Sequence, residues 1–112
     1  MNEEVLDWKE AMARVLNKRE LYCKLLGKFI DSEQNSGAKI ADVLNSGDAE
    51  EARRLVHTTK GAAANLGAKA LAAAALELEM AIKANADTST AMAHFNSALT
   101  DTLVAMQAFQ AQ

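Results

Sequence analysis

The sequence has no proline, a single cysteine and few aromatic residues. Of its 112 residues, 4% are aromatic, five are glycine and 24 are alanine. This composition disfavours sheet architectures, which need many turns and β-branched or aromatic strand residues, and it favours long helices. Cys23 has no partner for an intramolecular disulfide, and with His57 and His94 it offers too few ligands at suitable spacing for a zinc site. We therefore expect no bound metal, and we expect His94 to be an ordinary surface histidine.

Long apolar runs and an excess of positive charge are also missing. The longest apolar run covers residues 70–76, whereas a membrane span needs about 20 residues, and the first twenty residues contain no signal-like apolar segment. The formal net charge of −3 argues against attraction of the whole protein to nucleic acid or an anionic membrane. We expect a cytoplasmic protein with no membrane insertion and no nucleic-acid binding, folded as one domain over residues 1–112.

One segment carries positive charges with no negative charge among them. Residues 52–76 contain no Asp or Glu but carry Arg53, Arg54, Lys60 and Lys69, which leaves a net charge of −7 for the rest of the chain. The sequence therefore predicts a local basic patch on an acidic body.

Apolar residues recur at three- and four-residue spacing along most of the chain, which predicts helices. The expected helices cover residues 8–16, 21–44 with a break near 35–37, 49–66, 68–85 and about 90–109. Asp7, Asp48 and residues 88–90 are expected N-caps, and Gly47 and Gly67 are expected to end the helices before them. Because the connections are short, we predict an all-α fold, an up-down antiparallel four-helix bundle with an additional short N-terminal helix.

Apolar stripes also predict the core. Leu21 begins the widest stripe, which continues to Ile30, and the five methionines are expected to fill gaps in the core. On the helix over residues 49–66, the apolar residues gather on one side, and His57 points about 150° away from their mean direction. We therefore expect His57 to face solvent.

The face of His57 also carries Arg53, Lys60, Gly61 and Ala64. A glycine in the middle of a helix costs about 1 kcal/mol relative to alanine, which suggests that something needs space beside the histidine. An imidazole nitrogen is a good nucleophile toward activated phosphorus, and a nearby lysine stabilises the charge of a phosphoryl group. Spacing alone is more typical of an ordinary solvated helix face than of phosphoryl chemistry.

The exact residues that follow His57 favour phosphoryl chemistry at this histidine. The segment His57-Thr58-Thr59-Lys60-Gly61-Ala62-Ala63 closely resembles the active-site helix of histidine-containing phosphotransfer (HPt) domains, whose pattern is His-[Ser/Thr]-x-Lys-Gly-[Ala/Ser]-[Ala/Ser]. The resemblance extends over nearly the whole chain. At the position written x, this chain has Thr59, where many members of the family have an aliphatic residue.

This resemblance implies a function for each residue of the face. His57 would accept a phosphoryl group from a phospho-aspartate of a response-regulator receiver domain and pass it to the aspartate of another receiver. Lys60 would stabilise the phosphoryl charge, Gly61 would leave space beside the imidazole, and Ala64 would lie on the docking face. The receiver would dock over this helix and the one before it. Arg53 lies outside the pattern, and we infer that its charge assists docking.

No nucleotide-binding loop or aspartate cluster is present for ATP and magnesium. We therefore expect a phosphocarrier with no cofactor of its own, not a kinase, with Mg²⁺ held by the partner receiver. A hybrid sensor histidine kinase is a second candidate partner, and we expect a monomer. Two alternatives stay open: an HPt-like module that binds a partner without transferring phosphoryl, and a generic helical scaffold. The intact set of His57, Lys60 and Gly61 weighs against the first, and only the motif argues against the second.

Overall fold

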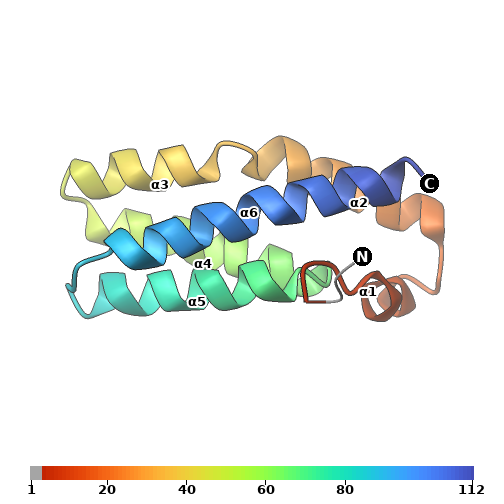
Figure 1. Cartoon of the computed structure of the whole chain (residues 1–112), viewed down its shortest axis with the longest axis horizontal. Coiled ribbons are helices and arrows are strands. Elements are labelled where there is room, and N and C mark those ends of the chain that lie inside the picture. Colours follow the sequence, from red (N-terminus) through yellow and green to blue (C-terminus); the bar gives the residue numbers. More distant parts are fainter. Residues whose placement is uncertain (1–3) are drawn as a thin grey trace.

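Helices make up most of residues 4–112, which are the part of the chain that the computed structural model describes. The helices are α1 (Trp8–Arg14), α2 (Arg19–Glu33), α3 (Ser36–Asn45), α4 (Ala49–Asn65), α5 (Lys69–Lys83) and α6 (Ser89–Gln110). No strand occurs among these residues, so the all-α prediction is confirmed. The molecule measures 42 × 21 × 20 Å because its long helices run beside one another (Figure 1). Within this part of the chain, no helix combines the length and the hydrophobicity needed to cross a membrane.

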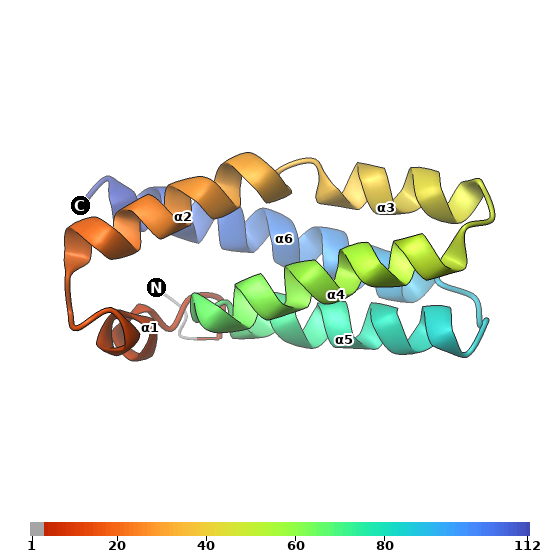
Figure 2. The same cartoon turned by 180° about the vertical axis from the view of Figure 1, so that it is seen from behind.

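The predicted break after the first long helix lies between α2 and α3. These two helices follow one another along the same side of the molecule, and α4, α5 and α6 then reverse direction in turn (Figures 1 and 2). The Ser36 hydroxyl donates to the Glu33 carbonyl at 2.9 Å, which satisfies an acceptor at the end of α2. A Cβ on Gly37 would collide with the side chain of Asn96 on α6, so this glycine lets α3 and α6 approach closely. The break is therefore confirmed, with Ser36 and Gly37 as the first residues of α3.

The predicted side-chain caps are present at the start of α1 and α4. The Asp48 carboxylate accepts a hydrogen bond from the backbone N–H of Glu51 at 3.1 Å, and Asp7 caps α1 in the same way. At α6 the N-cap residue is Thr88, but its side chain makes no capping bond. Asp87 accepts the backbone N–H of Ser89 at 2.9 Å instead.

The core lies between the helices, and an aromatic cluster fills one end of it. Tyr22 is fully buried, and its hydroxyl donates to the Leu66 carbonyl at 2.7 Å. The ring of Phe109 lies 5.2 Å from that of Tyr22 and 5.4 Å from that of Trp8, measured between ring centroids. Two expected core residues are exposed instead.

Leu21 is 42% exposed and Met80 is 60% exposed. In both cases the apolar surface of the helix is wider than the strip that its neighbours cover, so these side chains lie beyond the edge of the contact. The prediction that the five methionines fill the core is therefore wrong for Met80, and Met1 lies outside the described residues.

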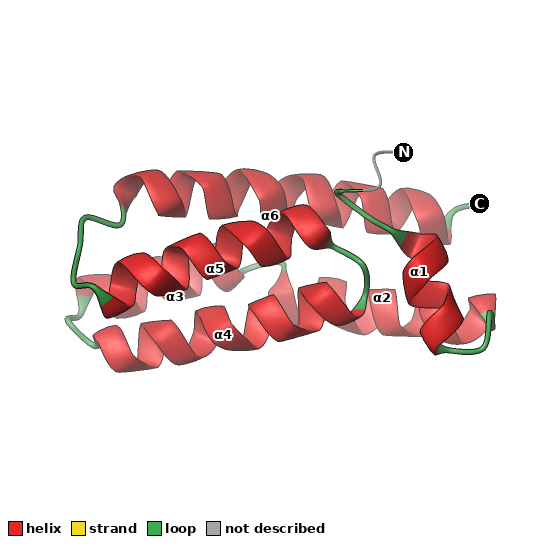
Figure 3. Cartoon of the chain, turned by 90° about the horizontal axis from the view of Figure 1, so that it is seen from below, coloured by secondary structure: helices red, strands yellow, loops and turns green. Residues whose placement is uncertain are grey.

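The N-terminal segment packs across one end of the bundle, at the C-terminal end of α4 (Figure 3). The backbone N–H of Asp7 donates to the Gly67 carbonyl at 2.8 Å. From α1, the Arg14 guanidinium donates to the carbonyls of Ala64 at 3.2 Å and Asn65 at 2.8 Å. These bonds satisfy acceptors that the end of a helix leaves free and fix the position of α4.

Gly67→Ala is expected to lower the free energy of unfolding by about 2–4 kcal/mol. The φ of Gly67 is +87°, where an alanine is strained by roughly 1 kcal/mol. The new Cβ would also collide with the backbone carbonyl of Asp7, which adds an overpacking cost of about 1–3 kcal/mol. Urea denaturation measures the loss.

Gly47→Ala is the matched control for this substitution. Gly47 has the same φ of +87°, but a Cβ there would have no neighbour within 4 Å, so only the conformational cost applies. Equal losses for the two variants would contradict the collision with Asp7.

Candidate functional site

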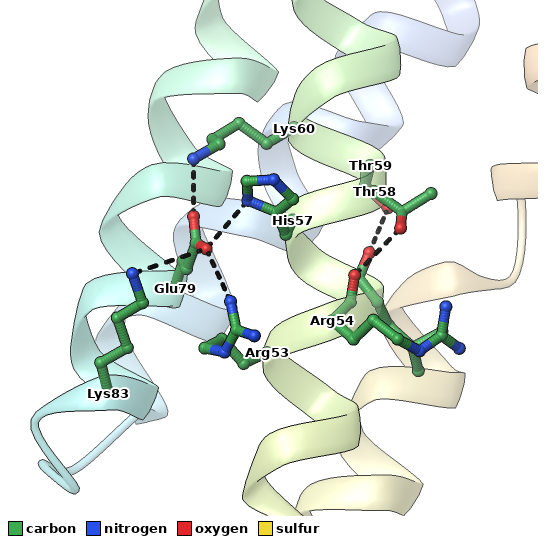
Figure 4. A network of polar contacts seen from close by, with 9 residues as sticks. Arg53, Arg54, His57, Thr58, Thr59, Lys60, Glu79 and Lys83 are labelled. Carbon is green, nitrogen blue, oxygen red and sulfur yellow. Dashed lines mark hydrogen bonds and ion pairs between the residues drawn. The ribbon is translucent and has the colours of Figure 1, made fainter.

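His57 lies in the middle of α4 on its solvent-facing side (Figure 4). Its side chain is 61% exposed, while Ala52, Val56 and Ala63 on the opposite face of the helix are fully buried. The orientation predicted from helical spacing is therefore confirmed. Because the histidine is held by a regular helix, its backbone has little freedom to move.

A buried carboxylate from the next helix lies beside the imidazole. Glu79 on α5 is only 2% exposed, and its Oε2 lies 3.0 Å from Nδ1 of His57. Its Oε1 accepts a hydrogen bond from Lys60 Nζ at 2.7 Å. Two further cations approach Oε2, with Arg53 Nη1 at 3.5 Å and Lys83 Nζ at 3.9 Å. Glu79 thus brings together three residues that the sequence singled out, and it adds Lys83.

The surroundings of Glu79 determine which nitrogen of His57 carries the proton. The hydrogen bond from Lys60 is the main reason that the pKa of the Glu79 carboxyl lies below its ordinary value of 4.5; burial opposes this shift, and the bond to His57 adds to it. Glu79 is therefore ionised at neutral pH, and an ionised carboxylate only accepts hydrogen bonds. Nδ1 of His57 must then be the donor. The lone pair is left on Nε2, which lies on the far side of the ring from Glu79 (Figure 4), in a side chain that is 61% exposed.

The cluster carries more positive than negative charge. Arg53, Lys60 and Lys83 surround the single carboxylate of Glu79, which gives an excess of two positive charges beside the imidazole. Such an excess stabilises an anionic group attached to Nε2 of His57. The arrangement is suited to a nucleophilic nitrogen that acquires a doubly negative substituent.

Gly61 and Ala64 are exposed on the same side of α4. A Cβ on Gly61 would meet nothing within 4 Å, so no contact among the described residues requires a glycine there. The surface of α4 beside His57 is therefore open at this position.

Arg54 and Thr59 are not part of the cluster. Arg54 pairs with Glu51 on its own helix, with the guanidinium Nε 2.5 Å from the carboxylate. Thr59 is 1% exposed, and its hydroxyl donates to the carboxylate of Glu33 at the end of α2. This bond satisfies the polar group that the sequence places in the core stripe of α4.

Glu79 was missed by the sequence analysis, although a signal for it exists. It lies four residues after Ala75 and three before Ile82, both of which belong to the buried stripe of α5. An ionisable residue at core spacing needs a charged partner on another element, because burying an unpaired charge is very unfavourable. That requirement points to the basic face of the neighbouring helix.

His94 lies on the surface, as predicted, with its side chain 58% exposed. Its Nδ1 is 3.0 Å from a carboxylate oxygen of Glu77 on α5. Among residues 4–112, no group of three or more His, Cys, Asp or Glu side chains is placed to hold a metal ion.

Comparison with known proteins gives one match. A protein-family model, described as the Hpt domain, matches residues 24–109 of the sequence. This range includes both His57 and Glu79. No curated protein and no solved structure matches the chain.

Glu79→Gln is expected to destabilise the protein by about 1–3 kcal/mol at neutral pH, because it leaves Lys60 and its neighbours without a buried anionic partner. Folding lowers the pKa of Glu79, so the ionised carboxylate stabilises the folded state above pH 4.5, and this contribution is lost as the pH falls through the lower folded pKa. The difference in unfolding free energy between wild type and variant should therefore shrink in acid. Urea denaturation across the acidic and neutral range measures it.

Glu77→Gln is the control for this effect. Glu77 lies on the same helix but is 46% exposed in its pair with His94, and removing an exposed pair changes stability by less than about 1 kcal/mol. A loss for Glu79→Gln that does not depend on pH would contradict ion pairing as its cause.

Proposed function

The chain belongs to the Hpt domain family, whose members carry out histidine phosphotransfer in two-component systems, and on that premise we propose that His57 relays a phosphoryl group between two receiver domains. Domains of this family interact with receiver domains and kinases. The observation that carries the proposal is the 3.0 Å contact between Nδ1 of His57 and the carboxylate of Glu79, which leaves Nε2 as the nucleophile of an exposed side chain.

The accepting step forms a nitrogen–phosphorus bond. The lone pair of Nε2 on His57 attacks the phosphorus of the aspartyl phosphate on the donor receiver, and the bond between phosphorus and the aspartate oxygen breaks. The aspartate leaves as a carboxylate. The imidazole ring becomes cationic, since Nδ1 keeps its proton, and the carboxylate of Glu79 stabilises this charge.

The donating step reverses these changes with a second receiver. A carboxylate oxygen of its aspartate attacks the phosphorus, the nitrogen–phosphorus bond breaks, and the lone pair returns to Nε2 of His57. We assign the stabilisation of the phosphoryl oxygens to Lys60, which lies one turn from His57, with a contribution to docking from Arg53. Mg²⁺ belongs to the receiver in this scheme. The chain is then a phosphocarrier that contributes the nucleophile and its charged surroundings.

The proposal also covers the finer description of the fold. We count α2 and α3 together as one of the four helices of an up-down antiparallel bundle, with α1 as the additional N-terminal helix. We treat residues 1–112 as one domain. The alternative function is an Hpt-like module that binds a partner without transferring phosphoryl. The free Nε2 of His57 and the surplus of cations around Glu79 favour transfer.

His57→Gln is expected to abolish phosphoryl uptake while leaving the helix content unchanged, because the side chain is exposed and the substitution removes the nucleophile. The protein is mixed with a panel of receiver domains charged on aspartate, and intact-mass measurement detects an acid-labile, alkali-stable adduct. Circular dichroism compares the folds. Fragment masses of the wild-type adduct locate the modified residue independently of the variant.

His94→Gln is the matched control, since the chain has only these two histidines. It should accept phosphoryl at the wild-type rate. An adduct that persists in His57→Gln, or a wild-type chain that binds receivers and takes no phosphoryl from any of them, would contradict the carrier function.

Gly61→Ala is expected to raise stability and to slow transfer. Alanine is the better helix former by about 1 kcal/mol, and the new Cβ meets nothing in the free protein. In the complex, the same methyl group occupies space beside His57, and we expect transfer from a receiver to fall at least about tenfold, since misplacement of the reacting atoms is costly. Uptake from phosphoramidate, a small donor, should change far less. An unchanged transfer rate would show that the receiver does not occupy the space at Gly61 beside His57.

A further inference from the structure

A cavity lies at the break between α2 and α3, against α4. Its volume is about 130 Å³, and residues of all three helices line it. We term it the break cavity, and its lining includes Glu33, Ser36, Lys39, Ile40, Leu55 and Thr59. It lies on the side of α4 that faces α2 and α3, whereas Glu79 approaches His57 from α5 (Figure 4). The break cavity is therefore separate from the charged cluster around His57.

Two features that phosphotransfer leaves unexplained meet in this cavity. One is the break itself, because α2 ends at Glu33 and α3 begins at Ser36. The other is Thr59, a polar residue in the otherwise apolar stripe of α4. The hydroxyl of Thr59 donates to Oε1 of Glu33, so these two features are joined by one hydrogen bond. The chain thus builds a polar wall where the helix packing alone needs an apolar one.

Glu33 is in an unfavourable position for a negative charge. It is half-buried and is the last residue of α2, and the C-terminal end of a helix carries a partial negative charge of its own. Within residues 4–112, its carboxylate has the hydrogen bond from Thr59 and no ion pair. A carboxylate in such surroundings is stabilised by an added cation, and an ammonium group provides both charge and hydrogen-bond donors.

The two cations at the cavity have different surroundings. The guanidinium of Arg54 is already paired with Glu51, with Nη2 2.9 Å from a carboxylate oxygen. Lys39 is exposed and makes no ion pair in the described part of the chain. Glu33 attracts a simple cation that Lys39 repels, and Lys39 attracts a simple anion that Glu33 repels. A molecule that carries both charges satisfies both residues.

Size and apolar lining restrict the ligand further. Ile40 and Leu55 supply apolar surface next to the polar wall. A closed cavity of about 150 Å³ is large enough for benzene, so a space of similar volume suits a ligand of roughly six to eight non-hydrogen atoms. An α-amino acid with a short aliphatic side chain has this size. It also has the required ammonium, carboxylate and apolar groups.

We propose that the break cavity binds a small zwitterion of the α-amino acid class, with its ammonium group on Glu33 and its carboxylate on Lys39. The aliphatic side chain packs against Ile40 and Leu55. The hydroxyl of Ser36 donates to the Glu33 carbonyl at 2.9 Å, so its oxygen is left as a further acceptor for the ammonium group. This inference goes beyond the proposed function and does not depend on phosphoryl transfer at His57.

The test titrates the ¹⁵N-labelled chain with L-valine and follows the backbone amide signals by NMR. For a ligand of roughly eight non-hydrogen atoms, we expect a dissociation constant of about 1 mM. The largest shifts should fall in residues 33–40 and 54–59, which contain the lining of α3 and α4. Valine amide lacks the carboxylate, and N-acetylvaline lacks the ammonium group. Each should bind at least about tenfold more weakly than valine, since it leaves one charged residue unpaired.

Glu33→Gln removes the negative charge and keeps an oxygen that accepts from Thr59, so the fold should be retained. It should weaken the binding of valine at least about tenfold. Asp31→Asn is the matched control, because it removes the same charge from the last turn of α2 at a residue that does not line the cavity. It should bind valine as the wild type does. Circular dichroism compares the helix content of both variants.

Several results would overturn the inference. If valine at about 10 mM shifts no amide signal, the cavity does not bind an amino acid. If valine amide binds as tightly as valine, Lys39 takes no part, and if N-acetylvaline does so, Glu33 takes no part. Shifts concentrated around Glu79 and Lys83 would place the ligand on α5 instead. The comparison of the three ligands uses only the wild type, so it decides the matter even if Glu33→Gln does not fold.

Discussion

The buried carboxylate of Glu79 is the constraint on which the site depends. An ionised carboxylate is stable in a protein interior only when hydrogen bonds and opposite charges replace the water that it has lost. Lys60 and His57 provide these bonds from α4. The same contacts therefore fix how α4 lies against α5 and which nitrogen of the imidazole is free. Structural stability and chemical reactivity share one set of interactions in this protein.

The rest of the architecture keeps α4 in place around that contact. At its N-terminus, Asp48 caps the helix, and at its C-terminus the turn at Gly67 contacts the N-terminal segment. Arg14 adds hydrogen bonds to the last carbonyls of the helix. His57 thus lies between two anchored ends, on a regular element instead of a loop. A reactive atom on such an element keeps a constant position relative to the surface around it.

Local signals in the sequence predicted much of this structure. The helix bounds, the caps at Asp7 and Asp48, the break before Ser36 and the outward direction of His57 all depend on residues within one or two turns of each other. The contacts of Glu79 depend on the register between α4 and α5, which no local pattern contains. The exposure of Met80 depends on how much of α5 its neighbours cover. Side-chain periodicity identifies an apolar stripe but not the width of the surface that meets it.

In the relay that we propose, the single free nitrogen Nε2 of His57 also determines how partners share the protein. One reactive atom on one face would serve both the domain that gives the phosphoryl group and the domain that takes it, so the two could not be bound at once. Donor and acceptor are then competitors for the same surface. A receiver that dissociates slowly would keep His57 unavailable to the next partner. Among related complexes, differences in affinity come mainly from differences in the dissociation rate. In that proposed relay, weak and short-lived complexes favour transfer through this domain, and the abundance of each receiver becomes part of the control of the pathway.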